Sequence, residues 1–167
     1  FLYTVSALSD DFQVIDISSS TNPEIVGTYD PEDTAVYDDG FSVVVDGSYA
    51  YIAASTTVHI IDISSTTNPT AAGIYRPNDT TILNAGRQIH KQGDYVFVAS
   101  EDTVGSDDTF LIIDVSIPAS PTLVSSTTIN GLSGVALKGD YAYAGSDATD
   151  DISIIDISTL ADPQIVT

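Results

Sequence analysis

The sequence predicts an all-β fold built from one unit that repeats along the chain. Two phrases recur and interleave. The first reads "VIDISSSTNPE" and occurs, with variation, at 14–24, 60–70, 112–122 and 154–164. The second reads "VDGSYAYIAAS" and occurs at 45–55, 91–100 and 137–146. Because the glycines of the second phrase are 46 residues apart, both phrases indicate a repeat architecture.

Each repeat is expected to hold four short strands, as the stretch 42–75 illustrates. Runs of β-branched and aromatic residues occupy 42–45, 49–53, 58–63 and 71–75. An Asp-Gly turn separates the first two runs, and an Asn-Pro turn separates the last two. No window shows helical periodicity. A unit of 46 residues with four antiparallel strands is typical of a blade of a β-propeller.

The remaining strands follow from alignment with this unit. The chain opens with "FLYTVSA", which aligns with the second strand "YAYIAAS", and it closes with "PQIVT", a fourth strand. Fifteen strands are therefore expected, three of them first strands. The units are 1–48, 49–94, 95–140 and 141–167, within one propeller domain or segment. The chain holds about 3.6 blades, which is either a four-bladed propeller or part of a larger one.

The first unit lacks its first strand, and two interpretations follow. The chain is either a portion of a longer propeller, or the missing strand comes from elsewhere, including a neighbouring copy. Donation of a strand between copies builds polymers, because unpaired edge groups seek a partner.

The repeat resembles a known family, the LVIVD-repeat β-propellers. The resemblance rests on "GxYAYxA", then "xxIIDIS", then "NP" and a short apolar strand, and it extends over essentially the whole chain. It implies a propeller fold in an extracellular or cell-surface protein of bacteria or archaea, often without an assigned activity. The third unit departs from the pattern, with a longer loop "SEDTVGSDDTF" at 100–110 and "IPASP" in place of Asn-Pro.

Composition limits the classes of partner. Twenty-four acidic residues against four Lys and Arg give a formal net charge of −20, which disfavours nucleic acids and anionic membrane surfaces. The chain has no cysteine, so disulfides and thiolate chemistry are impossible. An acidic, Ser- and Thr-rich chain with little lysine favours an extracellular or cell-surface location. No apolar run reaches the roughly 20 residues of a membrane span, so this segment is not expected to insert into a membrane.

An aspartate ends the third strand of each unit, and a proline follows seven residues later. These residues are Asp16, Asp62, Asp114 and Asp156. A carboxylate at that position can accept backbone N–H groups of the Ser/Thr-rich turn. We expect them to act as turn clamps that hold the outer hairpin. A shared metal is not expected, because equivalent residues of successive blades lie far apart around a ring.

The acidic loops 30–40, 100–109 and 146–151 are candidates for calcium binding, because Ca²⁺ takes six to eight oxygen ligands. The most plausible ligands are Glu101, Asp102, Asp107 and Asp108. None of the loops has EF-hand spacing. The alternative is that they are solvated loops of an acidic protein. Calcium is the one cofactor considered.

The rare basic residues gather in one stretch. Arg87 and Lys91 flank His90, and the alignment places His90 on a first strand, near the central channel. Such a cluster could receive an anionic ligand, or the acidic loop of a neighbouring molecule. Local salt bridges are the alternative.

Catalytic motifs are absent from the sequence: it contains no "GxSxG", "HExxH", P-loop or haem motif. Only His59 and His90 could serve as a histidine base, and His59 lies within a third strand, where packing is its expected role. We therefore expect no enzymatic activity. Asn78 begins the sequence Asn-Asp-Thr, a glycosylation acceptor pattern.

These observations favour a non-catalytic extracellular propeller, a structural or adhesive module of a cell-surface or filamentous assembly. Its partners would be other copies of itself or surface proteins. A propeller that binds a glycan, peptide or small anion at the channel mouth is the alternative. A hydrolase whose further blades supply the missing residues is less favoured.

Overall fold

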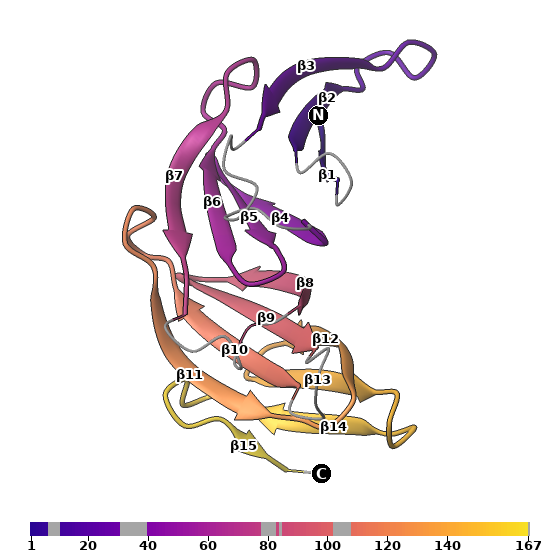
Figure 1. Ribbon diagram of the computed structural model, residues 1–167. Coiled ribbons are helices and arrows are strands. Elements are labelled where there is room, and N and C mark those ends of the chain that lie inside the picture. The colour runs from indigo at the N-terminus through magenta and orange to yellow at the C-terminus, as the bar shows by residue number, and fades with distance from the viewer. Residues whose placement is uncertain (7–10, 31–39, 78–82, 84, 102–107, 167) are drawn as a thin grey trace.

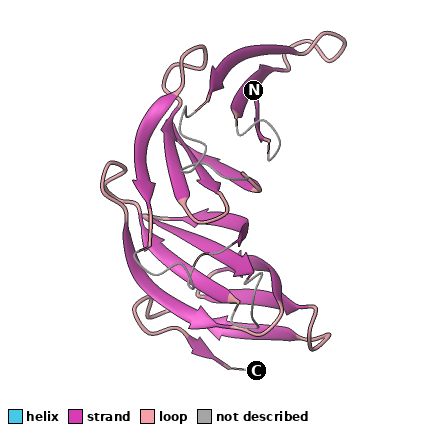
Figure 2. Ribbon diagram, in the orientation of Figure 1, coloured by secondary structure: helices cyan, strands magenta, loops and turns pink. Residues whose placement is uncertain are grey.

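The structure is a computed structural model that describes residues 1–6, 11–30, 40–77, 83, 85–101 and 108–166. Across these residues the secondary structure consists of strands, turns and loops, with no helix (Figure 2). No segment in the described part is therefore a helix long and apolar enough to cross a membrane. The all-β prediction is confirmed, and the described residues form the fifteen expected strands.

The strands form four antiparallel sheets, each a blade. Blade 1 comprises β1 (Leu2–Val5), β2 (Phe12–Asp16) and β3 (Glu24–Tyr29). Blade 2 comprises β4 (Ser42–Asp46), β5 (Tyr49–Ala53), β6 (Val58–Asp62) and β7 (Thr70–Tyr75). Blade 3 comprises β8 (Ala85–Gln92), β9 (Tyr95–Glu101), β10 (Thr109–Asp114) and β11 (Thr122–Thr128). Blade 4 comprises β12 (Leu132–Lys138), β13 (Tyr141–Ser146), β14 (Ile152–Asp156) and β15 (Gln164–Ile165).

The blades follow one another along an open arc (Figure 1). The first strands β4, β8 and β12 are neighbours on the concave side, and the fourth strands β3, β7, β11 and β15 lie on the convex side. Blade 1 and blade 4 form the two ends of the arc, and the termini lie far apart (Figure 1). Blade 1 has three strands among the described residues, because β1 aligns with the second strand of the other blades.

The blades begin at a different strand from the units counted in the sequence. Units 49–94 and 95–140 begin at a second strand, whereas blades 2 and 3 begin at the first strands β4 and β8. The hairpin between first and second strands is a two-residue turn with glycine leading. Gly47, Gly93 and Gly139 have φ values of 58°, 57° and 59°, a region that only glycine adopts easily and that suits a type II′ turn.

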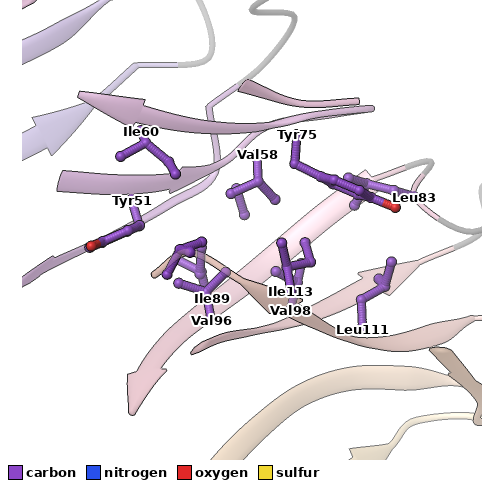
Figure 3. Close-up of a cluster of buried hydrophobic side chains, with 12 residues drawn as sticks. Tyr51, Val58, Ile60, Tyr75, Leu83, Ile89, Val96, Val98, Leu111 and Ile113 are labelled. Atoms are coloured by element: carbon purple, nitrogen blue, oxygen red, sulfur yellow. The ribbon is translucent and has the colours of Figure 1, made fainter. Parts of the chain in front are cut away.

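Packing of one blade against the next forms the core. Three clusters of buried apolar side chains lie between blades 1 and 2, blades 2 and 3, and blades 3 and 4. In the middle cluster, Val58 and Ile60 of blade 2 face Leu111 and Ile113 of blade 3 (Figure 3). Each internal blade therefore has a forward face, toward the next blade, and a backward face, toward the preceding blade. Residues alternate between the two faces along each strand, and apolar side chains occupy both faces.

The convex side has its own contact between blades. A β-bulge interrupts the pairing of the third and fourth strands in blades 1, 2 and 3. Beside the bulge, one residue of the fourth strand lies against the next blade. A Cβ added to Gly27 would lie 2.1 Å from the Thr66 carbonyl oxygen, and one added to Gly73 would lie 1.9 Å from that of Pro118. Ser125 occupies the same position in blade 3, where its Oγ donates a hydrogen bond to the Leu160 carbonyl at 2.6 Å. The turn that connects the third and fourth strands of a blade, here called the outer turn, therefore contacts the fourth strand of the preceding blade.

Candidate functional site

The four repeated aspartates occupy the same local structure in every blade. Each Oδ1 accepts the backbone N–H of the residue two positions later, at 2.8–2.9 Å. The acceptor and donor pairs are Asp16 with Ser18, Asp62 with Ser64, Asp114 with Ser116, and Asp156 with Ser158. Hydrogen bonds from these serines lower the pKa of all four carboxyl groups. This geometry ties the end of the third strand to the outer turn.

Arg87 lies in a β-bulge of β8 and points to the neighbouring strand rather than to an open site. Its guanidinium forms a salt bridge with Glu101 at the end of β9, and it lies 5.2 Å from the centre of the Phe41 ring. Both side chains of the salt bridge are partly exposed, so the pair contributes little to stability. Its contact with Phe41 links the first strand of blade 3 to blade 2.

His90 joins two blades on the concave side. Its Nε2 lies 2.6 Å from the Val135 carbonyl oxygen, so this nitrogen carries the proton and donates. Two residues before it, Gln88 accepts the Val135 N–H through Oε1 at 2.7 Å. Two residues after it, Gln92 donates to the Gly139 carbonyl at 3.2 Å. One face of β8 therefore binds the backbone of blade 4, and His90 is part of that contact.

Lys91 points the opposite way, toward blade 2. Its side chain is 7% exposed, and its ammonium lies 3.5 Å from Asp46 Oδ2 and 5.4 Å from the centre of the Tyr51 ring. The ammonium also donates a hydrogen bond to the Gly93 carbonyl. The three predicted ligand-binding residues therefore do not converge on one site. Arg87 contacts its own hairpin, His90 contacts blade 4, and Lys91 contacts blade 2.

The two described members of the predicted calcium set have other partners. Glu101 forms the salt bridge with Arg87. Asp108 is buried, and its Oδ2 accepts the Leu132 N–H at 2.9 Å, which joins blade 3 to the first strand of blade 4. Asp102 and Asp107 lie outside the described residues. Among the residues that are described, no group of three or more His, Asp or Glu side chains is placed to hold a metal.

Two further predicted positions are placed as follows. Asn78 lies outside the described residues. His59 is 1% exposed in β6, where its Nε2 lies 2.9 Å from Thr57 Oγ1. Its pairing with Ile52 places it on the backward face of blade 2, the face that packs against blade 1.

Two grooves occur at equivalent places between blades, near the hairpin of first and second strands. The groove between blades 2 and 3 has a volume of about 470 Å³, and the groove between blades 3 and 4 about 260 Å³. The larger groove is lined by polar and aromatic residues that include Asp46, Tyr49, Tyr51, Lys91 and Asp94. The smaller one is more apolar, with Phe97 and Leu160 at the positions of Tyr51 and Pro118.

The backward face of blade 1 is open to solvent. Leu2 and Ile17 are each 47% exposed. The register places Leu2 at the position of Ala50, and Ile17 follows Asp16 as Ile63 follows Asp62. Ala50 and Ile63 are 0% and 5% exposed, because blade 1 covers them. Blade 1 thus presents apolar side chains that are buried at the same positions in blade 2.

The forward face of blade 4 is open in the same way. Ile152 begins β14 and is 67% exposed, whereas Val58 and Phe110 at the equivalent positions are 0% exposed. Tyr141 is also exposed on this face. The two open faces are the largest departure of the structure from the pattern of buried repeats. Sequence reasoning predicted an unpaired strand edge in blade 1 but did not identify these faces, since the repeats carry the same apolar residues whether or not a neighbour covers them.

Comparison with known proteins agrees with the blade boundaries. A family model described as the LVIVD repeat matches residues 3–31, 39–76, 86–128 and 132–167. Each match coincides with one blade of the arc. The chain belongs to the LVIVD-repeat family. No curated protein matches it.

Solved structures that resemble this LVIVD-repeat chain are about twice as long. A candidate 6-phosphogluconolactonase from Bacteroides uniformis superposes with a TM-score of 0.79 at 12% identity, covering 98% of this chain and 49% of that one. A candidate 6-phosphogluconolactonase from Bacteroides fragilis has a TM-score of 0.74 at 13% identity, covering 95% of this chain and 48% of that one. At these identities the likeness shows the fold alone. The chain spans about half the length of the structures it matches.

Proposed function

We propose that this LVIVD-repeat chain is a non-catalytic structural module of an extracellular assembly, at a cell surface or in a filament. The observation that carries the proposal is that Arg87, His90 and Lys91 contact neighbouring strands and blades instead of converging on one site. At Ile152 and Ile17, side chains remain exposed that are buried at every equivalent internal position where a neighbouring blade packs. At each internal interface a neighbouring blade covers these positions, so the two end faces are surfaces on which another blade can pack.

The contacts of the chemically capable residues support a structural role. His90 donates to a backbone carbonyl of the next blade, His59 is buried, and Arg87 is paired with Glu101. A general base or an anion site needs such groups directed at a substrate. Here the described contacts use them to join strands and blades.

The extracellular location is supported by composition. The chain is rich in Asp, Ser and Thr and has only four Lys and Arg residues, a composition that favours an extracellular or cell-surface protein. The lactonase names of the similar solved structures are not carried over to this chain. At 12–13% identity over half of their length, those structures share its fold alone.

Ligand capture is a second candidate, and the groove between blades 2 and 3 is the observation that favours it. Tyr49, Asp46 and Asp94 line it, and aromatic faces beside carboxylates suit a glycan. Titration of the intact chain with a panel of neutral and anionic oligosaccharides, followed by NMR, tests this candidate. Saturable shifts confined to the groove support it, and no shifts at the highest soluble glycan concentration count against it.

The assembly proposal is tested by sedimentation of the chain over a range of concentrations. Ile152→Lys places a charge on the exposed forward face of blade 4 and reports whether that face takes part in association. The matched control is Ile117→Lys, since Ile117 is similarly exposed, at 64%, but lies in the outer turn of an internal blade. If the unmodified chain sediments as a monomer at every concentration, the proposal is wrong.

A further inference from the structure

We propose that the groove between blades 2 and 3 binds one residue of a neutral sugar, and that the equivalent groove between blades 3 and 4 does not. The inference rests on the second candidate function given above, the capture of a glycan, and it names the ligand class and the groups that hold it. Four polar side chains carry it, and all of them line the larger groove: Asp46, Tyr51, Lys91 and Asp94. It does not require that the chain assembles.

The groove is a gap between two blades that are packed together. One wall is the hairpin of β4 and β5, with Asp46 and Tyr49, and the other includes Asp94 and Pro118 of blade 3. The Pro118 carbonyl lies directly against Gly73 of blade 2, which holds the second wall in place. The volume of about 470 Å³ falls within the range of about 300–1,000 Å³ that is usual for small-molecule sites, whereas the 260 Å³ of the other groove falls below it.

The hydroxyl group of Tyr51 is the observation that points to a ligand. Tyr51 is 4% exposed and lines the groove, and its hydroxyl has no hydrogen-bond partner among the described residues. Figure 3 shows its oxygen at the edge of the middle cluster, pointing away from the other labelled side chains. Burial raises the pKa of Tyr51, and the charge of Asp46 raises it further, so the hydroxyl keeps its proton and can donate. Buried tyrosine hydroxyls usually have a partner, and a ligand oxygen in the groove would supply one.

Lys91 places a second donor beside this hydroxyl. Its side chain is 7% exposed, and its ammonium lies 3.5 Å from Asp46 Oδ2 and 5.4 Å from the centre of the Tyr51 ring. An ammonium has three N–H donors, and the contacts with Asp46 and the Gly93 carbonyl use two of them, which leaves one for a ligand. The exposed carboxylates of Asp46 and Asp94 supply acceptors on the same groove.

The charges of the groove favour a ligand that carries no charge. An anion would meet Asp46 and Asp94 on a chain of formal charge −20, since the one ammonium is already paired with Asp46. A cation would meet the Lys91 ammonium, which already lies over the Tyr51 ring. A sugar hydroxyl both donates and accepts, so one sugar residue can bind the carboxylates and the two donors together.

Tyr49 supplies an aromatic surface that suits a sugar ring. Its side chain is half-buried and packs against the middle cluster, so its ring is held on the wall of the groove. The C–H face of a pyranose ring is apolar and can pack on such a surface, while its hydroxyls point outward to polar groups. An aromatic wall with a few convergent polar groups is the usual composition of a small-molecule site.

The groove between blades 3 and 4 shows which of these groups the packing of blades requires. The two grooves differ at three equivalent positions, where the pairs are Tyr51 and Phe97, Lys91 and Leu137, and Asp46 and Gln92. Phe97 and Leu137 belong to the apolar cluster between blades 3 and 4, which pack together without a hydroxyl or an ion pair at these positions. The polar groups of the larger groove are therefore not needed for packing, and this supports a ligand-binding role for them.

Titration of the intact chain with small sugars, followed by amide shifts in NMR spectra, tests the inference. The neutral probes are the methyl glycosides of glucose, galactose, mannose and N-acetylglucosamine. Glucuronate and glucosamine are the anionic and cationic counterparts of the glucoside. We expect saturable shifts from at least one neutral probe at the hairpin of β4 and β5 and around Asp94. Both charged probes should bind at least about tenfold more weakly than that neutral probe.

Two variants copy the smaller groove into the larger one. Tyr51→Phe introduces the side chain found at 97, and the addition of Lys91→Leu introduces the side chain found at 137. Loss of one hydrogen bond should weaken binding of the neutral probe by about threefold to tenfold in the single variant, and the double variant should show no saturable binding. Tyr143→Phe is the matched control, because Tyr143 holds the position of Tyr51 in blade 4 and lies outside the groove.

Equal affinity of the unmodified chain and Tyr51→Phe, or shifts centred on the groove between blades 3 and 4, would overturn the site. Tighter binding of glucuronate or glucosamine than of every neutral probe would overturn the ligand class and leave glycan capture standing. Absence of shifts with all of these sugars would overturn the inference, and glycan capture itself fails only if the oligosaccharide panel gives no shifts either. The structural role is tested separately, by sedimentation.

Discussion

Substitution of Gly73 by alanine tests whether the convex contacts hold neighbouring blades together. Gly73 lies in β7, and an added Cβ would stand 1.9 Å from the Pro118 carbonyl oxygen and 2.9 Å from its carbon. Both atoms belong to the backbone of an outer turn that is closed by a hydrogen bond from Ser120 N–H to the Ile117 carbonyl. The turn must therefore move by roughly 1 Å or more, since carbon-to-oxygen contacts stay near 3 Å or longer.

The cost follows from overpacking. Forcing an extra methyl group into a close-packed contact costs about 1–3 kcal/mol, and a backbone obstacle places this case toward the upper end. Alanine offsets about 0.4–1 kcal/mol of this loss in the free energy of unfolding, because it reduces the conformational entropy of the unfolded chain. A net loss of about 2 kcal/mol corresponds to a fall of roughly 4–8 °C in melting temperature for a chain of this size. Thermal and urea unfolding, followed by circular dichroism, measure it.

Gly145→Ala provides the matched control. Gly145 also lies in a strand, but its added Cβ would meet only Ser133 Oγ, at 3.6 Å, an ordinary van der Waals contact. We expect this variant to melt at or slightly above the temperature of the unmodified chain. The reasoning about the convex contact is refuted if Gly73→Ala and Gly145→Ala melt at the same temperature.

Three further predictions concern acid, salt and the core. Hydrogen bonds lower the folded pKa of the turn-clamp aspartates below 3.8, so their contribution to stability is present above that pH and is lost as pH falls through the folded pKa. Replacement of all four by asparagine keeps an acceptor oxygen and removes the titration. The variant's melting temperature should therefore depend less on pH below about 4 than that of the unmodified chain, and equal slopes would contradict the assignment. Because the charge is −20, the melting temperature should rise when NaCl is raised from about 0.05 to 1 M, and a fall would show that attraction between charges dominates. Phe110 is fully buried between blades 3 and 4, so its replacement by alanine should lower the free energy of unfolding by about 3–5 kcal/mol, as measured by urea unfolding. A decrease of less than about 1 kcal/mol would place Phe110 outside the core.

The strands could be predicted from the sequence because their ends and turns depend on local residue patterns. The spacing of Gly47, Gly93 and Gly139 located the hairpins, and the structure places each of these glycines at positive φ in a two-residue turn. Alternation along the third strand places Ile61 and Ile63 on one face and Ile60 on the other, and a neighbouring blade packs against each face. The missing first strand of blade 1 was visible in the same alignment.

Side-chain partners could not be predicted, because they depend on bulges and on the distance between blades. Arg87 meets Glu101 because a register shift between Gly86 and Gln88 leaves Arg87 as the extra residue of a bulge. Periodicity in the sequence does not reveal such a shift. His90 and Lys91 are adjacent in sequence but belong to opposite faces of β8, so one contacts blade 4 and the other blade 2.

Burial at the ends of the arc was equally beyond sequence reasoning. Ile152 and Val58 occupy equivalent repeat positions and have similar side chains, yet one is 67% exposed and the other 0%. Only the presence of a neighbouring blade distinguishes them. The functional proposal therefore depends on three-dimensional context rather than on a motif.

Sedimentation of the intact chain across a wide range of concentrations tests the central claim most directly, with Ile152→Lys measured beside it. The account predicts that the unmodified chain shifts from one copy of 17.5 kDa to larger species as concentration rises, and comparison with Ile152→Lys shows whether the exposed face of blade 4 takes part. Monomers of the unmodified chain under every condition would contradict the proposed assembly.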